Sequence, residues 1–586
     1  MTASLPAAIA ASLAPHPIPD RTGVNTFVED VEGQSLLPLY LAPALAEHLL
    51  PHLRRLGELA GDELDRLAYE ADCNPPTLQH RTRAGREEQR IVKHPSYVAL
   101  EKVAFADYGL AAMSHRPGVL GWPEAMPPAA KYALTFQLVQ AEFGLCCPLS
   151  MTDSLTRTLR KYGDEELVKR YLADLTSQDL DALSQGSMFM TEQGAGSDVA
   201  ATATMAVPDA SEPGRAWRLY GEKWFCSNPD AALGMILART EGAPAGMKGV
   251  SLFLLPRVLP DGTPNSYRII RLKDKLGSRS MASGEIRFEG AKAWRVGELG
   301  RGFAQMADMV NSSRLSNGMR AAGLMRRALA EALYFSRHRV AFGQRLVDMP
   351  LMQRQLAKIM LPAEQARTMM FQAADALRRS DAGEDGRYAL TRLLTPLIKF
   401  RACRDARRAT GDAMEVRGGC GYIEEWGDPR IVRDAHLGSI WEGTSNIVAL
   451  DVIRAIRREG ALPVWRAHVT QLLQDTPWHA RPRAVLERLV ADVDRLAQSA
   501  AEKGQDAIAR QAATALYRLT AAIAMGWEAG RTGSVRRMLL AQLTVRHALM
   551  PRDPLRREDD VDLAPLFADA FERGDVAAVN ALGAAG

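Results

Sequence analysis

Apolar residues recur at helical spacing over most of the chain, with one interruption near its middle. Leucines from Leu41 to Leu67 are separated mainly by three, four or seven residues, and similar patterns cover about 95–170 and the region after Phe303. This spacing gathers apolar side chains on one face of a helix. The interruption, at about 185–300, contains short apolar runs between turn residues, which is typical of strands. The pattern therefore predicts a mainly α protein with a central β-domain.

The central region contains stretches with the length and composition of strands. Turn residues separate them, as in the Asp-Gly pair at 261–262. The predicted strands are 187–190, 217–225, 235–238, 250–255 and 267–272. Together they should form a small β-domain.

These patterns divide the chain into five segments. We expect an irregular N-terminal segment with a disordered lead-in, a helical domain, a middle β-domain, a second helical domain and a helical extension. The expected bounds are 1–35, 36–184, 185–300, 301–460 and 461–586. The extension should end in an acidic, partly ordered tail.

The composition is that of a soluble globular protein, with 47% apolar and 24% charged residues. No stretch approaches the roughly 18 consecutive apolar residues of a membrane helix, and no Lys or Arg precedes Arg21, so no signal peptide is expected. The six cysteines lack C-x-x-C spacing, which favours a reducing compartment and a cytoplasmic protein. His48 and His52 have ligand spacing, but Pro51 lies between them and no carboxylate is in register, so we expect no metal site.

Charge is distributed unevenly along the C-terminal region. Residues 451–552 carry 16 Arg and Lys against 9 Asp and Glu, whereas residues 553–586 carry 3 against 8. A basic segment can bind phosphates electrostatically, although solvated helix faces are the simpler explanation.

One carboxylate has an unusual setting. Glu442 lies between Trp441 and Gly443, and the residues Thr444 to Asn446 precede an apolar helical run. Ser, Thr and Asn cap helix starts, where free backbone N–H groups also bind anions. The motif therefore predicts either a carboxylate beside an anion-binding helix start or an ordinary capped helix with a surface Glu.

A glycine-rich loop follows the first predicted strand. Residues 191–198 combine small side chains with hydroxyls and main-chain N–H groups, and such a loop can approach a ring edge or a phosphate. It lacks the G-x-G-x-x-G spacing of a Rossmann fingerprint and the Gly-Lys-Ser/Thr of a P-loop. The loop therefore belongs to neither of those classes of nucleotide site.

Five motifs occur together in the order and spacing of one known family. They are TEQGAGSD at 191–198, KWFCSN at 223–228, RVAFG at 339–343, GGCGY at 418–422 and WEGTSN at 441–446. Over about residues 90–455 the sequence resembles the acyl-CoA dehydrogenase family. The resemblance implies an α-domain, a β-barrel-like domain and a four-helix α-domain, with an FAD cofactor, an acyl-CoA substrate and a homotetrameric assembly.

Other segments resemble one branch of this family, the AidB-type adaptive-response flavoproteins. They include 253–262, 271–280, the Asn74-Pro75-Pro76 turn and the long C-terminal extension. The branch resemblance implies sequence-independent binding of double-stranded DNA through the C-terminal region, protection against alkylation damage, and weak or vestigial dehydrogenase activity. The first basic residues expected to contact DNA are Arg454, Arg457 and Arg458.

The family resemblance also implies roles for individual residues. Glu442 would be the general base that removes the α-proton of the thioester, while the β-hydrogen passes as hydride to N5 of the flavin. Ser197 and Arg314 would contact the substrate. The residues expected to contact FAD are Met190, Thr191, Ser197, Phe225, Ser227, Arg339, Phe342, Glu415, Gly418, Gly419, Thr444 and Asn446. Of these, Arg339 and Phe342 would reach the FAD of a neighbouring subunit.

The sequence departs from the family pattern at two cofactor positions. Glu415 stands where Gln is common, and Phe225 stands where Trp is common. Two alternatives to a dehydrogenase stay open: a DNA-binding protective flavoprotein whose active site is vestigial, and an acyl-CoA oxidase that passes electrons to oxygen. The acyl chain length and the electron-transfer partner are also open.

Overall fold

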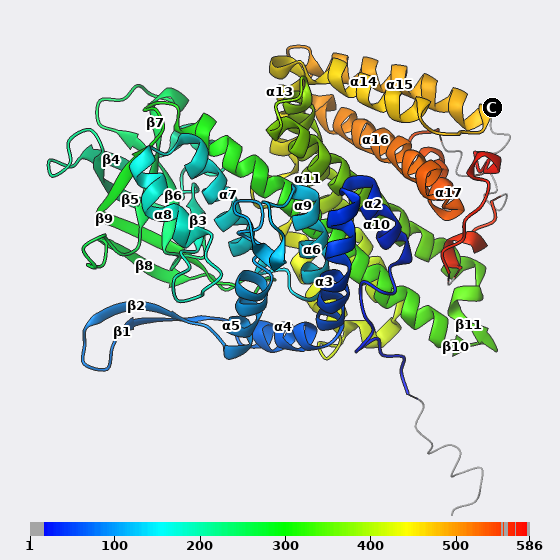
Figure 1. The fold of residues 1–586 in the computed structure, drawn as a ribbon, viewed down its shortest axis with the longest axis horizontal. Coiled ribbons are helices and arrows are strands. Elements are labelled where there is room, and N and C mark those ends of the chain that lie inside the picture. Colours follow the sequence, from blue (N-terminus) through cyan, green and yellow to red (C-terminus); the bar gives the residue numbers. More distant parts are fainter. Residues whose placement is uncertain (1–16, 552–554, 556–560, 569, 583–586) are drawn as a thin grey trace, which may run out of the picture.

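The computed structural model describes residues 17–551, 555, 561–568 and 570–582. Most of the predicted disordered lead-in and part of the acidic tail lie outside these residues. Helices form most of the molecule, and the larger strands gather in one domain at the left of Figure 1. The predicted fold class, mainly α with a central β-domain, is confirmed. Within the described ranges, no helix is long and apolar enough to cross a membrane.

The N-terminal domain is helical but contains a hairpin that the sequence analysis missed. Its hairpin strands β1 (Thr77–Arg81) and β2 (Glu87–Val92) are antiparallel and mostly polar, so no apolar alternation marks them. Gln89 ties this hairpin to the β-domain: its carbonyl accepts from Arg257 Nη2 at 2.6 Å, and its side chain accepts from Ile269 N at 3.0 Å. The helices are α2 (Val31–Tyr40), α3 (Pro43–Gly61), α4 (Glu63–Cys73), α5 (Pro95–Glu101), α6 (Pro128–Ala141), α7 (Cys146–Tyr162) and α8 (Glu165–Leu175).

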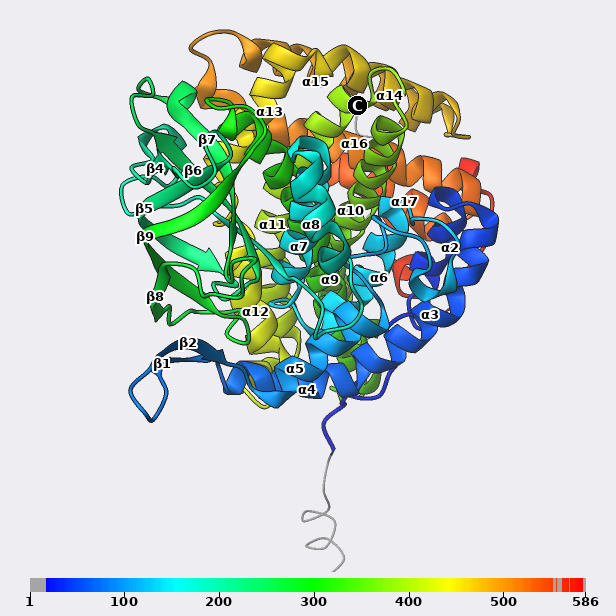
Figure 2. The same cartoon turned by 60° about the vertical axis from the view of Figure 1, so that its left-hand side comes forward.

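The β-domain is a closed sheet. Its strands are β3 (Gly186–Phe189), β4 (Met205–Pro208), β5 (Ala216–Ser227), β6 (Leu233–Thr240), β7 (Val250–Pro256), β8 (Tyr267–Leu272) and β9 (Ser283–Val296). Their order is β3-β6-β4-β5-β9-β7, with β8 beside β9. Because β7 pairs with both β9 and β6, the strands close into a barrel. Helices α7 and α8 lie against this domain in Figure 2 and share a hydrophobic cluster with β6 and β7.

A helical bundle follows the β-domain. It consists of α9 (Gly302–His338), α10 (Pro350–Asp381), α11 (Arg387–Val416), α12 (Gly427–Leu437) and α13 (Ser445–Glu459). Between α9 and α10, the strands β10 (Val340–Ala341) and β11 (Gln344–Arg345) form a small hairpin. Phe342 and Gly343 make its turn with φ values of 51° and 79°, the left-handed pair that a tight hairpin turn requires.

The C-terminal extension shares one hydrophobic core with the bundle and the N-terminal helices. Its helices are α14 (Ala461–Gln474), α15 (Ala480–Ala501), α16 (Ala509–Thr532) and α17 (Val535–Ala548). A buried polar network joins it to α2 and α10. Arg537 donates from Nε to Glu528 at 2.5 Å and from Nη1 to Glu364 at 2.9 Å, and Tyr40 donates from its hydroxyl to Glu528 at 2.7 Å. The extension is therefore packed into the molecule and is not an appended unit.

Candidate active site

Glu442 lies in the turn between α12 and α13, in a backbone conformation that non-glycine residues rarely adopt. Its φ is 56°, and that of Gly443 is 102°. Two cations hold the turn: Lys399 donates from Nζ to the Gly443 carbonyl, and Arg314 donates from Nε to the Glu442 carbonyl at 3.0 Å. A left-handed residue costs about 1–2 kcal/mol. The hydrogen bonds from Arg314 and Lys399 hold Glu442 in this unfavourable conformation, which points to a functional constraint.

The Glu442 carboxylate is held through one of its two oxygens. Ser313, on α9, donates from Oγ to Oε1. The side chain is 8% exposed, and Oε2 is buried without a hydrogen-bond partner among the described residues. Buried polar atoms are rarely left unpaired in native proteins. Oε2 is therefore the atom that a bound ligand would meet.

Two aromatic rings and an arginine border this carboxylate. Trp441 and Phe143 are stacked, with centroids 5.8 Å apart, and the guanidinium of Arg320 lies 4.6 Å from the Trp441 ring. Arg320 Nη2 is 3.8 Å from Glu442 Oε1, which is within ion-pair range but too long for a hydrogen bond. The carboxylate is thus largely shielded from solvent and lies within ion-pair range of the buried guanidinium of Arg320.

Cys147 lies between Arg320 and the end of strand β5 in the β-domain. Its thiol lies against Arg320 and Ser227, and Glu442 is close enough to act on it electrostatically. Burial raises the pKa of the thiol, so it stays protonated at neutral pH. Ser227 is the last residue of β5. The structure therefore brings Ser227 and Glu442, which are far apart in the sequence, to one site.

The two cations that hold the Glu442 turn differ in burial: Lys399 is fully buried, and the Arg314 side chain is 11% exposed. Burial lowers the pKa of Lys399 to about 8 and also lowers the pKa of Arg314. Arg314 donates from Nη1 to Asp451 at 2.7 Å. Arg314 therefore stabilises the Glu442 turn. Its predicted contact with acyl-CoA stays a prediction.

The glycine-rich loop is anchored from within the β-domain. Lys223 and Glu192 form a buried ion pair at 2.6 Å, and the Thr191 carbonyl accepts from Trp224 N at 2.8 Å. Phe225, on β5, is 60% exposed. The anchored glycine-rich loop and the exposed side chain of Phe225 provide a surface on which a planar ring can stack.

The predicted cofactor positions leave room for a ligand. A Cβ built on Gly194, Gly196, Gly418 or Gly419 would meet no atom within 4 Å, so a ligand can approach the backbone there. Thr444, the residue before α13, makes no side-chain capping bond within the described residues, which leaves N–H groups at the helix start for an anion. Four other predicted positions are exposed or half-buried: Met190, Ser197, Glu415 and Asn446.

Two predicted cofactor residues lie away from this site. Arg339 and Phe342 belong to the β10–β11 region, on the opposite side of the molecule from the β-domain in Figure 1. Both are exposed, and Phe342 is 96% exposed. Within this chain they cannot contact the same bound ligand as Phe225.

Four residues of the site were not identified from the sequence: Cys147, Ser313, Arg320 and Lys399. They come from three helices and reach Glu442 or its turn only in the folded chain. Ser313 is the neighbour of Arg314, which the sequence analysis did single out. No local pattern marks the other three, because each lies in an ordinary apolar helical stretch.

A buried acid near the site gives a pH-dependent stability. Asp434, on α12, accepts from Ser278 N at 2.5 Å, and burial, with a smaller contribution from Glu142, raises its pKa from 3.8 to about 7. The folded protein then retains a proton that the unfolded chain has lost. We expect the free energy of unfolding to fall by up to about 4 kcal/mol from this group as pH rises from about 4 to 7.

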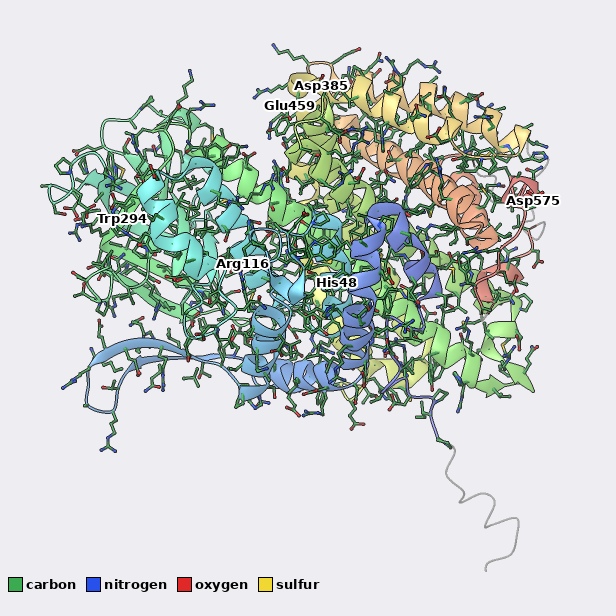
Figure 3. All side chains as sticks on the ribbon, in the orientation of Figure 1. His48, Arg116, Trp294, Asp385, Glu459 and Asp575 are labelled. Atoms are coloured by element: carbon green, nitrogen blue, oxygen red, sulfur yellow. The ribbon has the colours of Figure 1, made fainter. Side chains whose placement is uncertain are left out.

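Asp434→Asn should remove this contribution, because the amide keeps the acceptor for Ser278 but does not titrate. Urea unfolding at several pH values would measure it. Asp385→Asn, at an exposed turn (Figure 3), is the matched control and should follow the wild-type profile. An unchanged pH profile in Asp434→Asn would contradict the assignment.

The fold and this site define a known class of protein. Three family descriptions match in sequence: "Adaptive response protein AidB N-terminal domain" over residues 19–182, "Acyl-CoA dehydrogenase, middle domain" over 187–291 and "Acyl-CoA dehydrogenase, C-terminal domain" over 300–457. The chain therefore belongs to the acyl-CoA dehydrogenase family and carries an AidB-type N-terminal domain.

Individual relatives agree with this placement. "Putative acyl-CoA dehydrogenase AidB" of Escherichia coli is 35% identical over 421 residues, covering 70% of this chain and 74% of the relative. "Acyl-CoA dehydrogenase family member 11" of Caenorhabditis elegans is 33% identical over 436 residues, covering 72% and 69%. The solved structure of C. elegans ACDH-11 in complex with C11-CoA has a TM-score of 0.83 at 27% identity, covering 94% of this chain and 95% of that one.

Proposed function

We propose that the protein is an FAD-dependent acyl-CoA dehydrogenase in which Glu442 removes the α-proton of an acyl thioester. The observation that carries the proposal is the state of the Glu442 carboxylate. Ser313 donates to Oε1, while Oε2 is buried and has no hydrogen-bond partner among the described residues. A base that is oriented through one oxygen and keeps the other without a partner is suited to proton abstraction from carbon. The C11-CoA bound in the C. elegans structure supports acyl-CoA as the substrate class.

The residues present fit FAD. Phe225 offers an exposed aromatic side chain, Gly194 and Gly196 leave the loop open to a ligand, and the start of α13 after Thr444 can receive a pyrophosphate. FAD, when bound, would supply the acceptor for the β-hydride. Ser227 would then orient the ring next to Glu442.

The protein's own contribution is to position the base and exclude water. Arg314 and Lys399 fix the backbone of the Glu442 turn, so that the carboxylate reaches the α-carbon without rearrangement. The Glu442 side chain is only 8% exposed, and exclusion of water from it favours proton uptake from carbon. Loss of the α-proton and the β-hydride leaves a 2,3-enoyl thioester.

The distant β10–β11 hairpin suggests a shared cofactor site between subunits. Phe342 is almost fully exposed at its tip, and Arg339 begins it. We propose that the two side chains contact the FAD of a neighbouring subunit in a homotetramer. The supporting observation is a bare aromatic ring that its own chain leaves uncovered.

Anaerobic titration of the purified protein with acyl-CoA tests the proposal. Loss of oxidised-flavin absorbance on adding a thioester is the expected result. A protein without flavin, or a flavin that no thioester reduces, would refute it. Rapid reoxidation by air with formation of hydrogen peroxide would instead identify an acyl-CoA oxidase.

Binding of double-stranded DNA is a second candidate function, favoured by the AidB-type N-terminal domain and the basic region 451–552. Two of the three predicted contacts already have partners within the chain. Arg454 pairs with Asp451 at 2.8 Å, and Arg457 donates to the Ala501 carbonyl at 2.5 Å. Arg458 is exposed and has no ion pair among the described residues.

We expect DNA affinity to fall steeply with salt and to drop further when Arg458, Arg481 and Arg488, all exposed, are changed together to Gln. Fluorescence anisotropy with a labelled duplex at two salt concentrations would measure both effects. Arg454→Gln is the control and should bind nearly as the wild type does. Truncation at Gly460 is unsuitable, because α16 and α17 belong to the common core. Absence of binding would exclude this function, and salt-independent binding would contradict its electrostatic basis.

A further inference from the structure

Arg320 is a fully buried cation whose hydrogen-bonding capacity is largely unused. Its Nη1 and Nη2 atoms are buried and have no acceptor in the part of the chain that the structure describes. Its Nε donates to the Ser316 carbonyl at 3.4 Å. The thiol of Cys147 lies against the guanidinium, but a thiol is a weak acceptor. Glu442 Oε1, 3.8 Å from Nη2, compensates the charge but is too distant to accept a hydrogen bond. Buried donors without acceptors are unfavourable, and a bound ligand would supply the missing acceptors.

The surroundings fix the position of this guanidinium. It lies 4.6 Å from the Trp441 ring centroid and 5.7 Å from that of Phe143, and the two rings are inclined by only 21°. Through Cys147 it adjoins Ser227, and its Nη2 is 3.8 Å from Glu442. A substrate bound between Ser227 and Glu442 would therefore meet Arg320.

The other charges of the site have partners of their own. Arg314 is paired with Asp451, and Lys399 binds the Gly443 carbonyl. The Glu442 oxygen nearest to Arg320 accepts from Ser313. Among the described residues around Glu442, Arg320 alone has both Nη atoms without a hydrogen-bond acceptor, and this fork of donors matches a carboxylate.

We propose that Arg320 selects acyl thioesters whose acyl group carries a carboxylate, and that it binds this group through Nη1 and Nη2. The inference rests on the proposed acyl-CoA function of the Glu442 site. An alkyl chain of equal length would place hydrogens against the guanidinium and leave Nη1 and Nη2 without hydrogen-bond acceptors. The carboxylate of a dicarboxylic monothioester supplies these acceptors.

Matched thioesters test the proposal: glutaryl-CoA against pentanoyl-CoA, and adipyl-CoA against hexanoyl-CoA. The first readout is kcat/KM for anaerobic flavin reduction. The second is the Kd from the change in flavin absorbance on binding. The wild type should prefer the dicarboxylic ester of each pair by about 100-fold, because a site built for a polar group rejects the analogue that lacks it. Arg320→Leu should reverse this preference, and Arg320→Lys should keep part of it.

The controls separate this inference from the proposed function. Arg495→Leu, at an exposed position of α15, should keep the wild-type preference. If straight-chain esters reduce the flavin and dicarboxylic esters do not do so better, or if Arg320→Leu leaves the preference unchanged, the role of Arg320 is overturned alone. If no thioester binds or reduces the flavin, the proposed function fails and the inference fails with it. Where Arg320→Leu does not fold, the Arg320→Lys variant and the binding measurement decide.

Discussion

Replacing Glu442 by Gln is expected to slow flavin reduction by acyl-CoA by about 10³-fold or more. The change replaces Oε2, the carboxylate oxygen that has no partner among the described residues and that we propose accepts the α-proton. General bases contribute on the order of 10²–10⁴ in rate. Gln keeps the size of the side chain and an acceptor for Ser313, so the turn should keep its shape. Stopped-flow absorbance under anaerobic conditions would give the rate constants.

Ser313→Ala should slow flavin reduction less than Glu442→Gln does. It keeps the carboxylate but removes the hydrogen bond that orients Oε1, so we expect a loss of roughly tenfold from misorientation of the base. Both variants should retain the FAD content of the wild type, since neither residue belongs to the predicted cofactor contacts. Flavin reduction by Glu442→Gln at the wild-type rate would show that another group accepts the proton.

The second large effect is expected on stability. Arg537→Met should lower the free energy of unfolding by about 3–5 kcal/mol, because it leaves buried carboxylates uncompensated. Arg537 is fully buried, and its guanidinium binds Glu528, Glu364 and Thr368. These contacts join α17 to α16 and α10. We therefore expect their loss to destabilise the shared hydrophobic core as a unit. Urea unfolding followed by circular dichroism would measure it.

Arg495→Met is the matched control for this stability effect. Arg495 forms an ion pair with Asp492 on α15, but its side chain is 72% exposed. Exposed ion pairs typically contribute less than about 1 kcal/mol, so the midpoint should barely move. If Arg537→Met behaved like this control, the extension would not depend on the buried network.

Periodicity predicted the helices well because their apolar stripes are long. Among the strands, it found those whose apolar runs are bounded by turn residues, and it missed β4, which has four residues, and β9. In β9 the pattern is broken by Gly290, where the register of the β5–β9 pairing shifts. The integration of the extension was also missed, because Glu528 and Arg537 find their partners on α2 and α10 only after folding.

The candidate site, too, could be predicted only in part from the sequence. Glu442, Ser227 and the glycine-rich loop could be predicted because their motifs are contiguous in the sequence. Ser313 and Glu442 are in contact although 129 positions separate them in the sequence. Arg320 lies in a helix with several other arginines, and no local sequence pattern distinguishes it from them. Residues that act through tertiary contacts of this kind can be found only in the folded chain.

The central claim, that Glu442 takes a proton from the α-carbon of an acyl thioester, can be tested without the redox step. Acetyl-CoA has α-hydrogens but no β-carbon, so it can exchange protons and cannot give up a hydride. Its α-hydrogens should exchange with deuterium oxide in the presence of the FAD-loaded protein, as followed by proton NMR. The account predicts exchange by the wild type and only the buffer rate with Glu442→Gln. Equal exchange by both proteins, or none by the wild type, would contradict it.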